Sequence, residues 1–218
     1  MILQNGDRIV FAGDSVTDAG RARPIGEGGG LGDGFVRTIE NFLNVFYPER
    51  MMRVTNMGVS GNTSKDLLAR FDTDVVDLKP TYAVICIGFN DVWRQFDFPW
   101  MMGDHVLLGD YESNLRTMVK KCVGANIQPI FMTPYYMETN RNDAMRARMD
   151  EYGMKMKEIA KEMGVPCIDL QPAFDQLLQY RYPASIMWDR VHPGPIGSML
   201  IAKEFLNFVE FDFDRMKK

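Results

Sequence analysis

Residues 8–18 read RIVFAGDSVTD, a short apolar run that ends in a glycine and a group of polar side chains. The run from Arg8 to Ala12 is rich in β-branched and apolar residues, which is typical of a buried strand. Polar residues directly after such a strand lie at the carboxyl end of a parallel sheet, where α/β proteins bind their ligands. The stretch therefore predicts a first strand whose end lifts the Ser15 hydroxyl group to the rim of a sheet.

Outward from this strand, short β-rich runs alternate with longer stretches of helical period. Further strands are expected at residues 53–56, 82–87, 127–132 and 165–168. Helices are expected at residues 35–46, from Thr63 or Ser64 to just before Pro80, and at residues 111–123, 141–163, 172–179 and 196–209. The alternation predicts an α/β fold with helices on both faces of a parallel sheet. No linker or repeat interrupts it, so residues 1–218 are expected to form a single domain.

The segment GEGGGLGDG, residues 26–34, has the glycine content of a nucleotide-binding turn but not its pattern. No register gives the GxGxxG spacing, and no Gly-Lys pair occurs in the chain, so the sequence lacks a P-loop. We expect a flexible loop that leads into the first long helix.

Composition and charge limit the possible functions of the 218-residue chain. Its net charge of -4 gives no basic face for nucleic acid, and no run approaches the roughly 18 apolar residues of a membrane span. With His105 and His192 as the only histidines, a metal site with three histidine ligands is impossible. The three separated cysteines and the absence of a signal-like N-terminus predict a cytoplasmic protein with free, buried thiols.

Four short blocks fall at or near the carboxyl ends of the expected strands. They are Gly13-Asp14-Ser15, the run from Gly58 to Thr63, Gly88-Phe89-Asn90-Asp91, and Asp189-Arg190-Val191-His192-Pro193. The first three are, taken singly, also typical of a turn or a helix N-cap. Serine becomes a good nucleophile when a base takes its proton, and that base needs a partner that fixes its tautomer. Asp189 precedes His192 by three residues, so His192 rather than His105 is predicted to be the base.

The four blocks, in this order and over nearly the whole chain, resemble the SGNH hydrolases, also called the GDSL family. The resemblance implies Ser15 as the nucleophile, His192 as the base and Asp189 as the acid that orients it. It also implies an oxyanion hole made of the backbone N–H groups of Ser15 and Gly58 and the side chain of Asn90. Val16 replaces the family's leucine at an apolar packing position.

The same resemblance implies a flavodoxin-like, three-layer α/β/α fold with five parallel strands in the order 2-1-3-4-5, and neither a metal nor another cofactor. Residues 18–24, 90–95 and 188–193 also look like a bacterial branch of the family that includes acetylxylan esterases. This likeness implies a serine esterase that forms an acyl-enzyme and removes acetyl groups from xylo-oligosaccharides or related carbohydrates. A thioesterase or lysophospholipase of the same fold would use the same blocks and is the alternative.

Substrate contacts are expected next to the catalytic blocks. Trp93 and Trp188 flank these blocks, and their flat faces suit either sugar rings or protein packing. Arg94 and Arg190 are candidates for binding substrate hydroxyl groups, with ion pairs to acidic loops as an equal alternative. Asp14, beside the expected nucleophile, is a further candidate contact.

Two other classes of protein compete with the esterase. A phosphotransferase with an aspartate nucleophile would also have Asp14 after its first strand, but Val16 stands where a second aspartate is required. A carbohydrate-binding protein without activity has no use for Asp189 and His192 at this spacing. Apolar residues at 51–52, 96–102 and 205–213 predict exposed patches and, from them, a homo-oligomer.

Overall fold

The apolar run at residues 8–13 forms the central strand of the sheet, β1 (Arg8–Gly13), in the computed structural model, which describes residues 1–215. β1 lies parallel to β3 (Arg53–Gly58) on one side and to β4 (Tyr82–Cys86) on the other. β5 (Gln128–Met132) and β6 (Cys167–Ile168) extend the sheet beyond β4. Every residue of β4 is buried, as expected for a parallel strand that helices cover on both faces.

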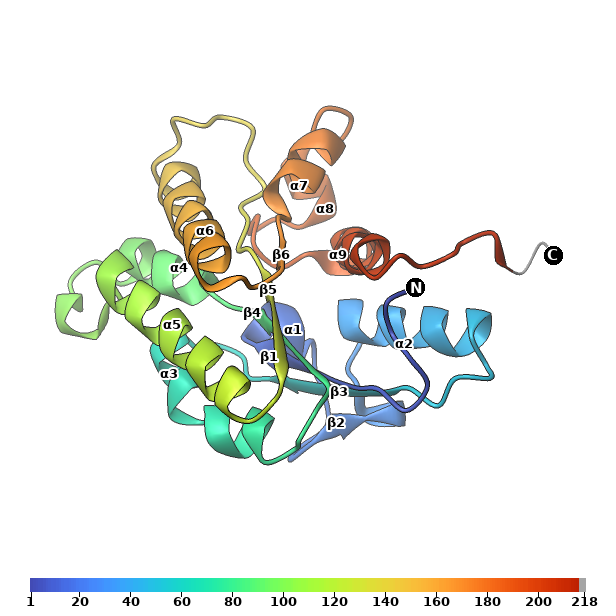
Figure 1. Ribbon diagram of the computed structural model, residues 1–218. Helices are drawn as coiled ribbons and strands as arrows, with labels where there is room; N and C mark the ends of the chain where they lie inside the picture. Colours follow the sequence, from blue (N-terminus) through green and yellow to red (C-terminus); the bar gives the residue numbers. More distant parts are fainter. Residues whose placement is uncertain (216–218) are drawn as a thin grey trace.

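The sheet has six strands in the order β2-β3-β1-β4-β5-β6 (Figure 1). The predicted order of the five parallel strands is confirmed, whereas the predicted total of five strands is wrong. The additional strand, β2 (Gly26–Glu27), pairs antiparallel with β3 at the edge of the sheet. The Glu27 carboxylate accepts hydrogen bonds from Arg53 and Thr55 of β3, which anchors the glycine-rich segment. The segment expected to be a loop is therefore in part a strand, followed by a 3-10 turn at Gly28–Gly30.

Helices cover both faces of the sheet. Within residues 1–215 they are α1 (Ser15–Asp18), α2 (Phe35–Phe46), α3 (Ser64–Ala69), α4 (Phe89–Asp97), α5 (Leu108–Gly124), α6 (Ala144–Met163), α7 (Gln171–Leu177), α8 (Pro183–Ile186) and α9 (Gly194–Phe208). Figure 1 shows α3, α5 and α6 on one face of the sheet and α2 and α9 on the other. This is the three-layer α/β/α arrangement that the sequence predicts.

The helix after β3 begins as expected and ends early. The Thr63 side chain accepts a hydrogen bond from the Asp66 N–H, and the Asp66 carboxylate bonds back to Thr63, so the two residues form a capping box at the start of α3. The helix was expected to reach Pro80, but α3 ends at Ala69. A π-type turn follows at Asp72–Val76, because the Asp77 N–H bonds the Asp72 carbonyl at 2.8 Å.

Packing explains two further differences from the expected elements. Residues 89–97, where no helix was expected, form α4 because Phe89 and Val92 bury their side chains in the core. Helix α6 begins at Ala144 rather than at residue 141, because the Asp143 carboxylate accepts the N–H groups of the first turn.

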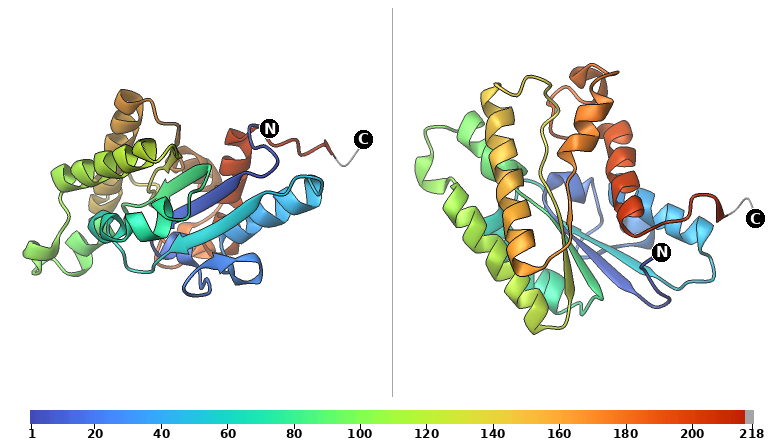
Figure 2. Two further views of the ribbon diagram at one scale, coloured as in Figure 1. Left: turned by 60° about the horizontal axis from the view of Figure 1, so that its bottom comes forward. Right: turned by 45° about the horizontal axis from the view of Figure 1, so that its top comes forward.

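The two ends of the described chain pack together beside one core. Phe11 of β1 contacts Phe35 of α2 and Phe205 of α9 edge to face, with ring centroids 5.7 and 5.2 Å apart. The Ile2 N–H donates to the Val209 carbonyl at 2.8 Å, which holds the first residues next to the end of α9 (Figure 2). No helix in the described part of the chain is long and apolar enough to span a membrane.

The cysteines differ in burial. Cys86 and Cys122 are buried, whereas Cys167 is only half-buried. All three thiols are free, and burial raises the pKa of the Cys122 thiol to about 12. The expectation of buried thiols therefore fits two of the three residues.

Candidate active site

Three neighbouring strands end at the same level of the sheet. Gly13, the last residue of β1, pairs with Gly58 of β3 and with Cys86 of β4. Because the strands are parallel, the segments that follow them emerge on one rim. Ser15 and Asn90 therefore start from neighbouring points, although 75 positions separate them in the sequence.

A continuous relay of hydrogen bonds joins the serine, the histidine and the aspartate. Ser15 Oγ lies 2.9 Å from His192 Nε2, and His192 Nδ1 lies 2.7 Å from Asp189 Oδ2. The other carboxylate oxygen, Asp189 Oδ1, accepts the backbone N–H groups of Val191 and His192 at 3.0 Å each. The carboxylate is thus held from both sides, with 8% of the Asp189 side chain exposed against 36% for His192. The aspartate is shielded while the imidazole faces the site.

The loop that carries Asp189 and His192 is fastened to the segment after β5. The Tyr135 hydroxyl donates to the Val191 carbonyl, and the Met137 N–H donates to the Arg190 carbonyl, both at 2.9 Å. Glu138 forms an ion pair with Arg190, whose backbone has a φ of 62°. Tyr135 itself is fully buried. This support was not predictable from the sequence, because no local pattern relates residues 135–138 to a loop more than fifty positions away.

The position of Gly58 does not fit its expected role in the oxyanion hole. Its N–H already donates to Asn56 Oδ1 at 2.9 Å, so this hydrogen is not available to a substrate. A Cβ atom at Gly58 would lie 2.2 Å from the Asp18 nitrogen, which shows why the position needs glycine. Gly58 allows β3 to approach α1 closely and does not face the site.

The second glycine of the same block, Gly61, is placed differently. It is exposed at a turn with a φ of 84°, and its N–H has no hydrogen-bond partner among residues 1–215. Asn62 follows Gly61 in the chain, and its carbonyl oxygen accepts a hydrogen bond from Asn90 Nδ2 at 2.9 Å. The second amide hydrogen of Asn90 stays available. Gly61 was not among the expected donors, although the second glycine in Gly58-Val59-Ser60-Gly61 could have indicated it.

Two fully buried carboxyl groups, those of Asp14 and Asp91, lie next to the carboxyl ends of the strands. Asp91 of α4 accepts the Ser64 N–H at 2.9 Å, which ties α4 to the start of α3, and burial raises its pKa to about 7. Burial likewise raises the pKa of Asp14 to about 8. Asp14 Oδ1 accepts the Val16 N–H at 3.0 Å, whereas its Oδ2 has no partner. Asp14 has no exposed surface, so the structure does not bear out its expected contact with substrate.

The two tryptophans expected to contact substrate differ in exposure, and the two arginines both form ion pairs within the protein. Trp93 is half-buried, with its ring 5.8 Å from the ring of His192, whereas Trp188 is 78% exposed. Arg94 forms an ion pair with Asp97, and Arg190 forms one with Glu138. Of the two interpretations of these arginines, the observed contacts favour ion pairs within the protein.

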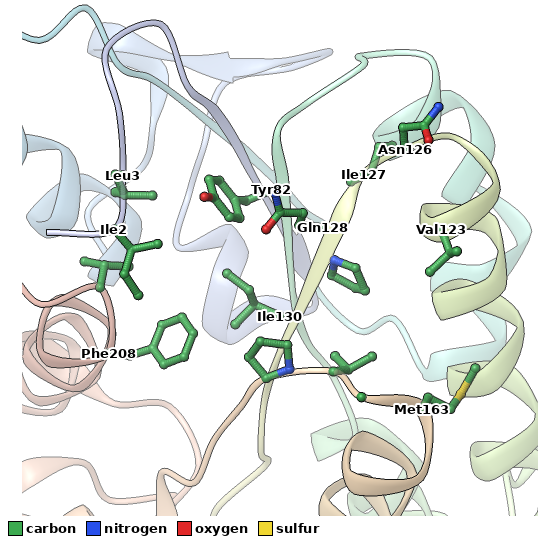
Figure 3. Close-up of a pocket in the computed structure, with 15 residues that line it drawn as sticks. Ile2, Leu3, Tyr82, Val123, Asn126, Ile127, Gln128, Ile130, Met163 and Phe208 are labelled. Carbon is green, nitrogen blue, oxygen red and sulfur yellow. The ribbon is translucent and has the colours of Figure 1, made fainter.

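Cavity size does not identify the site. Ser15 and His192 line a cavity of about 230 Å³, together with residues of α1, α9 and the segment before α2. A larger cavity of about 560 Å³ lies at the amino ends of β4 and β5 and contains none of the relay residues (Figure 3). His105 lines a third cavity, and its Nε2 lies 3.0 Å from the Phe98 carbonyl oxygen. The structure thus brings His192, and not His105, to Ser15.

Comparison with known proteins agrees with this geometry. The model of the GDSL-like lipase/acylhydrolase family matches residues 11–200. An acetylxylan esterase from Geobacillus stearothermophilus is 46% identical over 219 residues, which cover 100% of both chains. Its crystal structure superposes with a TM-score of 0.95 over 97% of this chain and 98% of that one.

Related solved structures extend the comparison. Catalytic mutants of the Geobacillus enzyme, in which a serine, a histidine or an aspartate is replaced by alanine, match equally well. An α/β hydrolase from the metagenome of Lake Arreo in Spain is 45% identical, with a TM-score of 0.93 over 96% of this chain and 98% of that one. The chain therefore belongs to the GDSL-like lipase/acylhydrolase family.

Proposed function

We propose that the protein is a serine esterase that removes acetyl groups from acetylated xylo-oligosaccharides. The observation that carries this proposal is the unbroken relay from Ser15 Oγ through the His192 ring to Asp189. Such a relay makes a hydroxyl group nucleophilic, because the imidazole takes its proton and the carboxylate stabilises the resulting imidazolium.

The chemistry divides into two steps. In the first, Ser15 Oγ attacks the ester carbonyl carbon while His192 Nε2 takes the hydroxyl proton and then passes it to the departing alcohol oxygen. This leaves an acetyl group on Ser15 and releases the sugar. In the second, His192 takes a proton from the water that attacks the acetyl carbonyl carbon. It then gives this proton to Ser15 Oγ as the acyl–oxygen bond breaks, which releases acetic acid and restores the free serine. Asp189 keeps its charge throughout and holds the imidazole ring in orientation.

Three hydrogen-bond donors are proposed to stabilise the oxyanion that forms in each step. They are the N–H groups of Ser15 and Gly61 and the second amide hydrogen of Asn90. Gly61 replaces Gly58 in this set because the Gly58 N–H is already bonded to Asn56. A crystal structure with a phosphonate bound covalently to Ser15 tests the set. The phosphonyl oxygen should lie within hydrogen-bonding distance of the Gly61 nitrogen, and a contact to Gly58 nitrogen instead would contradict the proposal.

The substrate class rests on the relatives. The Geobacillus enzyme is an acetylxylan esterase, and structures of its variants describe it as an acetyl-xylooligosaccharide esterase. The match over the full length at 46% identity supports the same substrate for this chain.

A deacetylation assay tests reaction and substrate together. Acetate release is measured from acetylated xylo-oligosaccharides and, in parallel, from other acetylated sugars, with Ser15→Ala as the control. We expect the xylo-oligosaccharides to be the better substrates and the variant to release no acetate above background. A clear preference for p-nitrophenyl octanoate over p-nitrophenyl acetate would instead favour a thioesterase or lysophospholipase.

Two properties of the whole protein belong to the same proposal. The three free thiols support a reducing compartment, from which we infer a cytoplasmic enzyme. Exposed apolar side chains in the segment after α4, Trp100 and Met102 among them, support a homo-oligomer. Light scattering checks the second point, and the mass of a monomer would contradict it.

A further inference from the structure

Among residues 1–215, Asp33 is the one acidic residue that lines the cavity beside the relay. One side of the cavity is formed by α1 and the residue that follows it, through Ser15, Val16 and Ala19. Another side is formed by residues 193–195 and by Ser198 of α9. Asp33, just before α2, closes the cavity. The volume is about 230 Å³, and most of the lining is apolar or small. Asp33 therefore decides the chemical character of this cavity.

The Asp33 carboxylate is free to bind a ligand. The residue is exposed, and its side chain makes no hydrogen bond or ion pair with any of residues 1–215. Its backbone, in contrast, is fixed, since the Asp33 N–H donates to the Ala19 carbonyl at 2.9 Å. The nearby carboxylates are already engaged: Asp18 bonds Arg23 and Ser60, and Asp189 bonds His192. A fixed, unpaired carboxylate accepts hydrogen bonds from hydroxyl groups.

The reaction geometry decides which half of an ester this cavity takes. The alcohol oxygen must lie beside His192, because His192 gives it a proton as it leaves. The carbonyl oxygen must face the oxyanion donors, and neither Gly61 nor Asn90 lines the cavity. An acetyl methyl group has no hydrogen to donate to Asp33, whereas a sugar ring carries several hydroxyl groups. The cavity therefore suits the alcohol half.

We propose that this cavity is the subsite for the sugar ring that carries the acetyl ester, and that Asp33 determines specificity by accepting hydrogen bonds from hydroxyl groups of that ring. The inference rests on the proposed function and deepens it. The apolar faces of Pro193 and Pro195 pack against the ring, while the Asp33 carboxylate fixes its orientation relative to Ser15.

The test compares two substrates that share an acetyl group and differ in the alcohol. For Asp33→Ala we expect KM for acetylated xylo-oligosaccharides to rise roughly 10- to 100-fold, the cost of losing hydrogen bonds to a charged group. Its kcat should stay at the wild-type value, as should both constants for p-nitrophenyl acetate, whose alcohol has no further hydroxyl group. Asp33→Asn keeps an acceptor oxygen and should give a smaller rise. Asp77→Ala, which removes an exposed carboxylate far from the cavity, is the matched control.

A second measurement separates this inference from the proposed function. Deacetylated xylo-oligosaccharide is used as an inhibitor of p-nitrophenyl acetate hydrolysis, which needs no turnover of a sugar ester. Asp33→Ala should raise the inhibition constant by the same factor as KM. If the wild type is inhibited in an Asp33-dependent way but releases no acetate from the sugar, the proposed function fails and this subsite stands.

Three outcomes would overturn the inference. Unchanged KM and inhibition constants in Asp33→Ala would remove Asp33 from the subsite. An equal loss of kcat with both substrates would show that Asp33 acts on the chemical step. A loss in Asp33→Asn as large as in Asp33→Ala would show that an acceptor oxygen at position 33 does not account for binding of the sugar hydroxyl groups.

Discussion

The two ends of the sheet present opposite combinations of volume and chemistry. The amino ends of β4 and β5 border a cavity of about 560 Å³ whose walls are mainly apolar, such as Tyr82, Ile130 and Phe208 (Figure 3). The carboxyl ends border one of about 230 Å³ that contains Ser15 and His192. Helices α1, α3 and α4 begin at the carboxyl rim, so the N–H groups of their first turns point to it. A parallel sheet thus concentrates donors and reactive side chains at one end, and cavity size alone does not reveal which.

Ser15→Ala is expected to have the largest effect at the carboxyl end. Removing the nucleophile should lower kcat/KM for p-nitrophenyl acetate by roughly 10⁴-fold or more, because the remaining residues cannot form an acyl-enzyme. Initial rates of p-nitrophenol release measure this. Wild-type rates in the purified variant would mean that the carboxyl rim is not the active site.

Asn90→Ala should have the next largest effect. It removes one of three proposed oxyanion donors, so kcat should fall roughly 10²- to 10³-fold while some activity survives. Steady-state kinetics at saturating substrate give the value. Asn114→Ala is the comparison, since Asn114 of α5 donates to Ser64 Oγ at the start of α3 and takes no part in the relay. An equal loss in both variants would indicate a structural role for Asn90.

Arg190→Ala should lower kcat by roughly two- to fivefold, because it loosens the loop that holds Asp189 and His192. Glu138→Gln breaks the same ion pair and should give a similar loss. KM for the sugar ester should change little in either variant. A rise in KM with kcat preserved, seen in Arg190→Ala and not in Glu138→Gln, would make Arg190 a substrate contact after all.

Asp14→Asn should change how stability depends on pH. The ordinary pKa of this carboxyl group is 3.8, and burial raises it to about 8 in the folded protein. Between these values the unfolded chain releases the proton and the folded protein keeps it, so the wild type loses stability as pH rises. The variant has no proton to keep, and its stability relative to wild type should increase by up to about 1.4 kcal/mol per pH unit. Urea unfolding at pH 5 and pH 7 measures the difference, and a pH-independent difference would contradict a protonated Asp14.

Gln128→Ala, at the larger cavity, should have no measurable effect on catalysis. Gln128 is exposed at the start of β5 and lines that cavity (Figure 3). Its kcat and KM for p-nitrophenyl acetate should match those of the wild type. A marked fall in kcat would show that the two ends of the sheet are coupled in catalysis.

The strands and the relay were predictable because their signals are local or periodic. Asp189 and His192 lie three positions apart, so a direct contact follows from spacing. The meeting of Ser15 with His192 follows from the rule that parallel strands share one rim, and the resemblance to a known family gave the roles.

Other parts of the fold depend on contacts between distant residues. The pairing of β2 with β3 depends on an open sheet edge and on the Glu27 contacts with Arg53 and Thr55. Gly58 and Gly61 fit an oxyanion hole equally well by residue type. The hydrogen bond from the Gly58 N–H to Asn56 distinguishes them, because it leaves only the Gly61 N–H available. Glu138 and Arg190 form an ion pair although 52 positions separate them, and no sequence pattern predicts this contact.

The hydrogen bond between Ser15 and His192 closes a separation of 177 positions, and this has a consequence for the newly made chain. The nucleophile leaves the ribosome first, and the base follows roughly 10 to 35 s later at ordinary rates of translation. During this interval the emerging protein contains the Ser15 nucleophile but not the histidine that activates it. Hydrolytic activity therefore begins only after the loop with Asp189 and His192 has reached Ser15, so the onset of ester hydrolysis reports when the two distant parts of the chain have joined.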